Sequence, residues 1–211
     1  MQRFVYLHGF ASGAQSRKAR FFGERMRETG RLLETPDLAG GDFENLTVSG
    51  QLQVLTELLR GERATLIGSS LGGYLAALYA SRHQEVERLV LLAPAFGFAQ
   101  RWREMVGVEA LEQWRATGSL AVYHYSEQRM RNLGYGIVEE SKRWEPEPTF
   151  GQPAILFHGL RDTVVPPSVS LEYVRAHPHV GLRLVDSDHE LGSALEQIWA
   201  ESGLAEISGR V

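Results

Sequence analysis

Six short apolar runs, most of them separated by segments with helical periodicity, are the feature that most constrains the fold of this chain. Such alternation predicts βαβ units, in which parallel strands are connected by helices. The runs are apolar almost throughout, which is typical of strands covered on both faces. We therefore expect an α/β protein, with a mainly parallel sheet of about six strands and helices on both sides. The six runs are residues 3–9, 31–38, 63–70, 88–96, 152–159 and 182–187.

The segments between these runs repeat apolar residues at intervals of three and four, which is the spacing of one helix face. Glycine or proline marks several of their ends, as at helix boundaries. These segments are predicted to be helices, and they span residues 18–30, 46–61, 71–83, 166–177 and 190–202.

Residues 97–151 interrupt this alternation and are rich in aromatic side chains. Within them, residues 101–114 and 137–148 have helical patterns, and residues 120–125 have the pattern of a short strand. An insertion of this length in an α/β protein is often a lid or cap over a binding site. We expect residues 1–211 to form one α/β domain with this cap-like insertion. Its aromatic side chains fit either an apolar acyl pocket or ordinary core packing.

The stretch LIGSSLGGYL carries the pattern Gly68-x-Ser70-x-Gly72 between a predicted strand and a predicted helix. This is the arrangement of a nucleophile elbow, in which a serine sits on a strained turn between two small residues. Ser70 is therefore the candidate nucleophile, whereas Ser69 lies one position off the pattern. The alternative interpretation of Ser70 is a turn residue that caps the following helix.

A serine nucleophile needs a base and an acid that orients the base. His189 is the candidate base, since it follows the last predicted strand and fits the chain order Ser, Asp, His. Asp162 follows the preceding predicted strand and is the candidate acid. Asp186 and Asp188 are the alternatives, but neighbours in sequence seldom present their side chains to one another.

An oxyanion hole requires two backbone N–H donors. Leu71, directly after the nucleophile, is expected to supply one, and Phe10, in the loop after the first strand, the other. Gly9 lets that loop turn close to the substrate. His8 either braces the loop by hydrogen bonding or is an ordinary residue at a strand end. Ser12 could position the loop or the substrate.

Four motifs in this order make the chain resemble an α/β-hydrolase: YLHGFASG, LIGSSLGGYLA, FHGLRDTVVP and DSDHEL. It is most similar to small bacterial esterases of the YqiA/YcfP type, whose opening is matched here by Ser16, Lys18 and Ala19. The resemblance implies hydrolysis of carboxylic ester or thioester bonds without a cofactor. Residues 97–151 match no motif of the family, so the resemblance does not identify the substrate.

Composition excludes several other classes of protein. The net charge of −4 argues against a nucleic-acid binder that relies on phosphate contacts. The absence of cysteine excludes disulfides, a cysteine nucleophile and thiolate metal sites. No apolar run is long enough to span a membrane, and residues 1–8 do not look like a signal peptide, so a cytoplasmic location is expected. The two histidines of HPH at 177–179 lack a third ligand at a standard spacing, so no metal is expected.

The sequence thus predicts a serine hydrolase of the carboxylesterase type that cleaves a small-molecule acyl ester through an acyl-enzyme intermediate. A thioesterase that uses the same residues is the first alternative. A non-catalytic binding protein on a hydrolase scaffold is the second. The acyl chain length and the oligomeric state are not readable from these patterns.

Overall fold

The computed structural model describes residues 2–207, and its main element is a six-stranded parallel sheet. Each strand falls on one of the six predicted apolar runs, and the predicted fold class is confirmed. The strand order is β2-β1-β3-β4-β7-β8. The strands are β1 (Arg3–Leu7), β2 (Leu33–Glu34), β3 (Ala64–Ser69), β4 (Val86–Leu92), β7 (Ala154–Gly159) and β8 (Val180–Val185).

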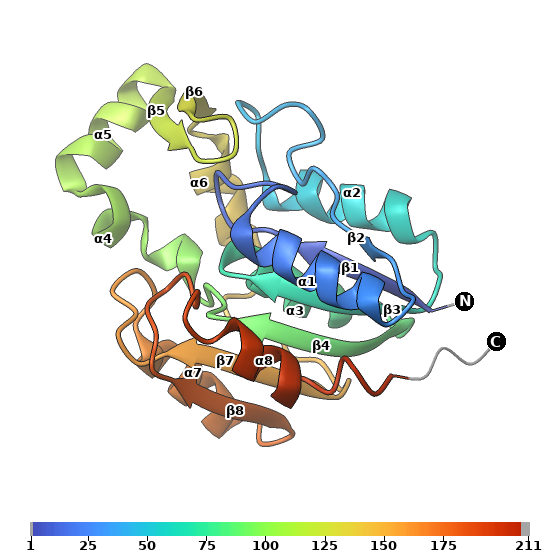
Figure 1. The fold of residues 1–211 in the computed structure, drawn as a ribbon. Coiled ribbons are helices and arrows are strands. Elements are labelled where there is room, and N and C mark those ends of the chain that lie inside the picture. The colour runs from blue at the N-terminus through green and yellow to red at the C-terminus, as the bar shows by residue number, and fades with distance from the viewer. Residues whose placement is uncertain (1, 208–211) are drawn as a thin grey trace.

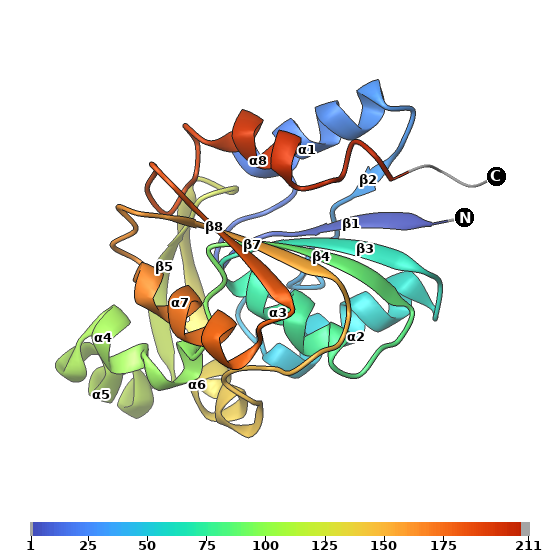
Figure 2. The same ribbon diagram turned by 90° about the horizontal axis from the view of Figure 1, so that it is seen from below.

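Helices cover both faces of this sheet (Figures 1 and 2). On one face lie α1 (Arg17–Glu28) and α8 (Leu195–Glu201). On the other lie α2 (Val48–Leu59), α3 (Leu71–Ala80) and α7 (Pro167–Ala176). No helix within residues 2–207 is long and apolar enough to cross a membrane.

Strand β1 shows why the apolar runs are continuous. Val5 and Leu7 pack into the hydrophobic cluster on the α2 and α3 side, whereas Phe4 and Tyr6 pack into the cluster on the α1 and α8 side. Successive side chains of a strand point to opposite faces, and here both faces are covered. The positions of β1 from Phe4 to Leu7 are therefore all apolar.

Residues 98–143 add a smaller group of elements beyond the carboxyl ends of the sheet strands (Figures 1 and 2). The helix expected over 101–114 is divided, because Gly107 adopts a φ of 85° between two helices. An antiparallel partner strand, β6, was not predicted. The elements are a 3-10 turn (Phe98–Gln100), α4 (Trp102–Val106), α5 (Val108–Thr117), β5 (Ser119–His124), β6 (Arg129–Gly134), α6 (Gly136–Glu140) and a second 3-10 turn (Ser141–Arg143).

This segment is packed on the sheet domain through its aromatic side chains. The ring of Phe98 meets that of Tyr74 on α3 at a centroid distance of 5.2 Å. The indoles of Trp102 and Trp114 are buried and lie edge to face at 5.4 Å. A carboxylate oxygen of Glu140 accepts the backbone N–H of Val48 at 2.8 Å, at the start of α2. The role of the segment as a cap stays a prediction.

The last helix begins at Leu195, later than the predicted start at residue 190. Residues 190–194 instead form the loop that follows His189. Leu191 adopts a φ of 55°, which is incompatible with a continuing right-handed helix. The side chains of Arg17 and Lys18 donate hydrogen bonds to backbone carbonyls of this loop and hold it against α1.

Candidate active site

Ser70 occupies a strained turn between β3 and α3. Its φ of 53° and ψ of −119° lie outside the regions that L-residues normally adopt. The backbone is held there by hydrogen bonds, since the N–H of Ser70 donates to Leu92 at 2.9 Å and its carbonyl accepts from Ala95 at 3.0 Å. The Ser70 side chain makes no capping hydrogen bond to α3, so helix capping does not explain this serine.

Two glycines allow this turn to form because three backbone segments meet there. A Cβ atom on Gly68 would lie 2.4 Å from the carbonyl oxygen of Gly72. A Cβ atom on Gly72 would lie 2.1 Å from the carbonyl oxygen of Leu7 at the end of β1. Both distances are far below van der Waals contact, so only glycine fits at either position. The close approach brings the loop after β1 next to Ser70.

Asp162 and His189 are joined by a hydrogen bond of 2.7 Å between Oδ2 and Nδ1. The carboxylate is fully buried, while 14% of the His189 side chain is exposed. Because Nδ1 faces a carboxylate, it carries the proton, and the lone pair of Nε2 is left to accept another. Ser70 and His189 are not hydrogen-bonded in this structure; such contacts are often long before substrate binds.

The loops that carry this acid and base are pressed together by backbone contacts. A Cβ atom on Gly159, at the end of β7, would lie 2.4 Å from the carbonyl oxygen of Asp188. The N–H groups of Leu160 and Arg161 donate to the carbonyls of Val185 and Ser187, each at 2.9 Å. Residues 27 positions apart in the sequence are thereby brought within hydrogen-bonding distance.

The Asp162 carboxylate is kept ionised by its surroundings. Burial alone would raise its pKa, but hydrogen bonds from His158 and His189, the charge interaction with His189 and the N–H of Val165 together hold the pKa of Asp162 well below its ordinary value. Oδ1 accepts the N–H groups of Val164 and Val165 at 2.9 and 2.8 Å. The group therefore remains a hydrogen-bond acceptor for His189 at neutral pH.

The two alternative acids have other partners. Asp186 forms an exposed ion pair with Arg161. Asp188 accepts the backbone N–H of Glu190 at 3.1 Å and so shapes the loop around His189. Neither contacts the imidazole, so the geometry favours Asp162 as the orienting group.

The loop after β1 lies beside Ser70, since a Cβ atom on Gly9 would be 3.3 Å from the Cβ of Ser70. His8 braces this loop: its Nδ1 contacts the Gly9 carbonyl at 3.0 Å, and its Nε2 accepts the N–H of Leu38 at 3.4 Å. Burial lowers the pKa of His8, so the ring is neutral at pH 7 and Nδ1 is the donor.

The N–H groups of Phe10 and Leu71 have no hydrogen-bond acceptor within the described residues 2–207. Both belong to backbone segments that border Ser70, the first through its neighbour Gly9 and the second at the start of α3. Free N–H groups in such positions are the donors that an oxyanion hole requires.

The segment 98–143 also contacts the loop after β1. Ala11 adopts a left-handed φ of 51°, and its carbonyl accepts the N–H of Tyr125 at 2.8 Å. The ring of Phe10 packs against those of Phe43 and Trp102 at centroid distances of 5.9 and 6.4 Å. The loop is thus enclosed between the sheet domain and the β5–β6 hairpin.

Sequence reasoning missed two residues that hold this site. His158 lies at the end of β7, and its Nε2 is 3.1 Å from Oδ2 of Asp162. Lys18 is buried, and its ammonium group contacts both the carbonyl and the carboxylate of Glu190 at 3.0 Å, one residue after His189. The spacing of four residues between His158 and Asp162 is a weak signal, and Lys18 stands out in the sequence only as part of the family-like opening with Ser16 and Ala19.

No group of three or more histidine, cysteine, aspartate or glutamate side chains suited to hold a metal ion occurs in the described part of the chain. The side chains of Asp162 and His189 pair with each other, and the N–H groups of Phe10 and Leu71 belong to segments that border Ser70.

Comparison with models of known families identifies the family of this chain. A family model described as "Uncharacterised protein family (UPF0227)" matches residues 3–203, nearly the whole length. The chain belongs to UPF0227. No curated protein matches it.

Several solved structures similar to this UPF0227 member are described as alpha/beta hydrolases. A putative hydrolase from Agrobacterium vitis S4 is 22% identical, with a TM-score of 0.79 over 93% of this chain and 85% of its own. Est1E from Butyrivibrio proteoclasticus is 18% identical, with a TM-score of 0.75 over 93% and 83%. Mouse alpha/beta hydrolase domain-containing protein 10 is 21% identical, with a TM-score of 0.73 over 93% and 86%. The resemblance to the α/β-hydrolase superfamily is confirmed at the level of the fold.

Proposed function

We propose that this UPF0227 protein is a serine hydrolase of the carboxylesterase type. The observation that carries the proposal is the pairing of His189 with the buried, ionised Asp162, which leaves Nε2 of the imidazole as the available base. The strained backbone of Ser70 and the two free N–H groups beside it supply the remaining parts of an acyl-transfer site.

In this mechanism, Nε2 of His189 removes the proton of Ser70 as Oγ attacks the acyl carbonyl. The N–H groups of Phe10 and Leu71 stabilise the oxyanion of the tetrahedral intermediate. Asp162 stabilises the imidazolium that forms, and this imidazolium then protonates the leaving alcohol. A water molecule, activated by the same imidazole, hydrolyses the acyl-enzyme and restores Ser70.

The proposed substrate is a small acyl ester. One α/β-hydrolase of similar structure, Est1E, has been solved with ferulic acid bound, and another is named a monoacylglycerol lipase, from Paleococcus ferrophilus. A thioester would react at the same groups, so a thioesterase is the second candidate. A purely non-catalytic binding role is disfavoured because acid, base, nucleophile and oxyanion donors are all retained.

The test compares the hydrolysis of p-nitrophenyl butyrate and a butyryl thioester by the wild type, Ser70→Ala and Ser69→Ala. Ser69 is the matched control, because it is the adjacent serine and is buried within β3. We expect Ser70→Ala to lower kcat/KM by at least about three orders of magnitude, and Ser69→Ala by less than about tenfold. Equal activity in Ser70→Ala and the wild type would rule out Ser70 as the nucleophile. The ratio of the two wild-type rates distinguishes esterase from thioesterase.

A further inference from the structure

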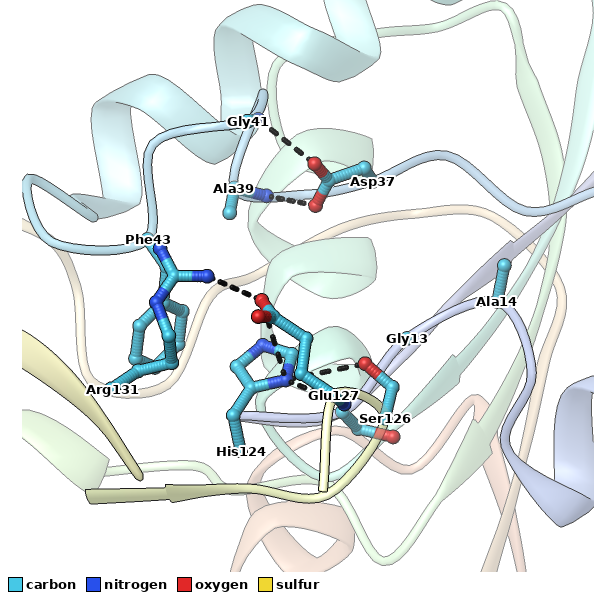
Figure 3. Close-up of a pocket in the computed structure, with 11 residues that line it drawn as sticks. Gly13, Ala14, Asp37, Ala39, Gly41, Phe43, His124, Ser126, Glu127 and Arg131 are labelled. Carbon is cyan, nitrogen blue, oxygen red and sulfur yellow. Dashed lines mark hydrogen bonds and ion pairs between the residues drawn. The ribbon is translucent and has the colours of Figure 1, made fainter. Parts of the chain in front are cut away.

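A polar cleft of about 230 Å³ lies between the oxyanion loop, the loop after β2 and the β5–β6 hairpin (Figure 3). Figure 3 shows Asp37 on one side of it and His124, Ser126 and Glu127 on the other. No residue proposed for the chemical step lines this cleft. Its lining includes the side chains of Ser12, Asp37, Phe43, His124, Glu127 and Arg131.

The wall formed by the loop after β2 supplies hydrogen-bond acceptors. The two carboxylate oxygens of Asp37 accept the N–H groups of Ala39 at 3.0 Å and Gly41 at 2.8 Å. These bonds fix the carboxylate at the cleft, and each oxygen retains a further lone pair. Asp37 is thus a preorganised acceptor for a ligand hydroxyl.

The wall formed by the hairpin supplies both donors and acceptors. Nδ1 of His124 accepts from the N–H of Glu127 at 3.3 Å and contacts the hydroxyl of Ser126 at 3.2 Å, so the ring proton is on Nε2. Burial lowers the pKa of His124, and the ring is neutral at pH 7. Arg131 forms an ion pair with Glu127 and lies over the ring of Phe43, with its guanidinium 5.7 Å from the ring centroid.

The cleft lies beside the loop after β1, which borders Ser70. A smaller hollow shares Ser12, Asp37 and His124 with it and extends to Gly9 and Phe10. Gly9 packs on Ser70, as described above, and Phe10 carries one of the proposed oxyanion donors. A substrate with its ester carbonyl at Ser70 would pass this loop to place a further group in the cleft.

The charges in the cleft disfavour an anionic ligand, because the carboxylates of Asp37 and Glu127 outnumber the one guanidinium of Arg131. A hydroxyl group is both donor and acceptor and can pair with each of these side chains without adding charge. Adjacent hydroxyls on a carbon chain match this mixed lining, and the ring of Phe43 offers an apolar surface for the carbons between them.

We propose that this cleft is a subsite for a diol or polyol portion of the ester substrate, held mainly by Asp37, His124 and Arg131. The inference rests on the proposed function for its link to the ester. The hydroxyls can belong to the acyl part or to the alcohol part of the ester, and the chemistry of recognition is the same.

Binding to Ser70→Ala protein tests the subsite without turnover. Three esters with related carbon chains serve as probes: propyl butyrate, glyceryl monobutyrate with its diol in the alcohol part, and propyl dihydroxybutyrate with its diol in the acyl part. Dissociation constants are measured by NMR titration. We expect at least one diol ester to bind about tenfold more tightly than propyl butyrate, and the diol ester that does so identifies the part of the substrate that the cleft holds.

Arg131→Gln and Ser12→Ala, each combined with Ser70→Ala, are expected to reduce that preference to about threefold or less. Arg129→Gln is the matched control, since Arg129 also pairs with Glu127 but does not line the cleft; it should leave the preference within about twofold of its value in Ser70→Ala alone. Ser12→Ala removes only one hydroxyl and tests the subsite even if Arg131→Gln unfolds.

Two results would overturn the subsite: equal binding of all three esters, or an equal loss of preference in Arg129→Gln and Arg131→Gln. Hydrolysis of propyl butyrate by the wild type reports separately on the proposed function. If the wild type hydrolyses no ester while the Ser70→Ala protein still prefers a diol ester, the proposed esterase activity is wrong but the diol-binding site stands. If the wild type hydrolyses propyl butyrate but the Ser70→Ala protein shows no preference for a diol ester, only the proposed subsite is wrong.

Discussion

His158 and His189 contact the same oxygen, Oδ2 of Asp162, at 3.1 and 2.7 Å. His158 is fully buried and is also bonded to the Ser170 hydroxyl at 2.6 Å and the Val165 carbonyl at 2.8 Å. His189 approaches from the other loop and is partly exposed. The carboxylate is therefore held from the core side by one imidazole while it also pairs with the partly exposed imidazole of His189.

Replacement of Asp162 by Asn is expected to lower kcat/KM for an acyl ester by about three to four orders of magnitude, because the amide cannot stabilise the imidazolium of His189. The matched control is Asp186→Asn, which removes an exposed ion pair with Arg161 near the same loop. It should change kcat/KM by less than about threefold. Similar losses in the two variants would contradict the assignment of Asp162.

The depressed pKa of Asp162 predicts a pH dependence of stability. The pKa is lower in the folded than in the unfolded state, where it is about 3.9, so its contribution to stability is present above that pH and lost as the pH falls below it. In urea unfolding, the free-energy difference between wild type and Asp162→Asn should shrink by about 1 kcal/mol from pH 7 to pH 3. A difference that is constant over this range would show that the carboxylate is not stabilised by folding.

Replacement of either of two neighbouring tryptophans by phenylalanine is expected to lower the free energy of unfolding by different amounts. Nε1 of Trp114 donates to the Leu133 carbonyl at 2.8 Å, whereas Nε1 of Trp102 is buried without a hydrogen-bond partner among residues 2–207. Trp114→Phe leaves a buried carbonyl with one bond fewer, and Trp102→Phe removes an unsatisfied donor. Urea unfolding should find Trp114→Phe more destabilising by about 1–2 kcal/mol. Equal losses of unfolding free energy in the two variants would mean that Nε1 of Trp102 has a hydrogen-bond partner in solution.

Replacement of two helical glycines by alanine is expected to change the stability of the protein in opposite directions. Gly23 in α1 has no atom within 4 Å of an added Cβ, so Gly23→Ala should stabilise the protein by about 0.5–1 kcal/mol. Gly72→Ala would place a Cβ 2.1 Å from the Leu7 carbonyl oxygen and should cost more than about 3 kcal/mol or prevent folding. Thermal unfolding measures both; a wild-type Tm for Gly72→Ala would contradict the close packing of β1 against α3.

The main sheet could be predicted from sequence because burial on both faces leaves a continuous apolar run in its inner strands. Strand β6 could not, since Arg129, Met130 and Arg131 are exposed or half-buried and give no such run. The turn before β6 was also hidden, because Gln128 adopts the left-handed φ of 53° that is usually found at Gly or Asn. Patterns of burial thus find core strands and overlook a hairpin at the surface.

The order of motifs was enough to name Ser70, Asp162 and His189 as candidates, because strand ends of a parallel sheet meet at one edge. It was not enough to find His158 or Lys18, whose contacts depend on how loops distant in sequence pack together. The polar cleft was missed for the same reason, since its walls come from three separate loops.

The most direct test of Ser70 as the nucleophile is labelling with a fluorophosphonate probe. The adducts are read by intact mass on wild-type and Ser70→Ala protein. The probe forms a stable adduct only with an activated serine, so we predict one adduct per wild-type chain and none on Ser70→Ala. Absence of an adduct on folded wild-type protein, or an adduct that persists in Ser70→Ala, would contradict the claim that Ser70 is the nucleophile of a serine hydrolase.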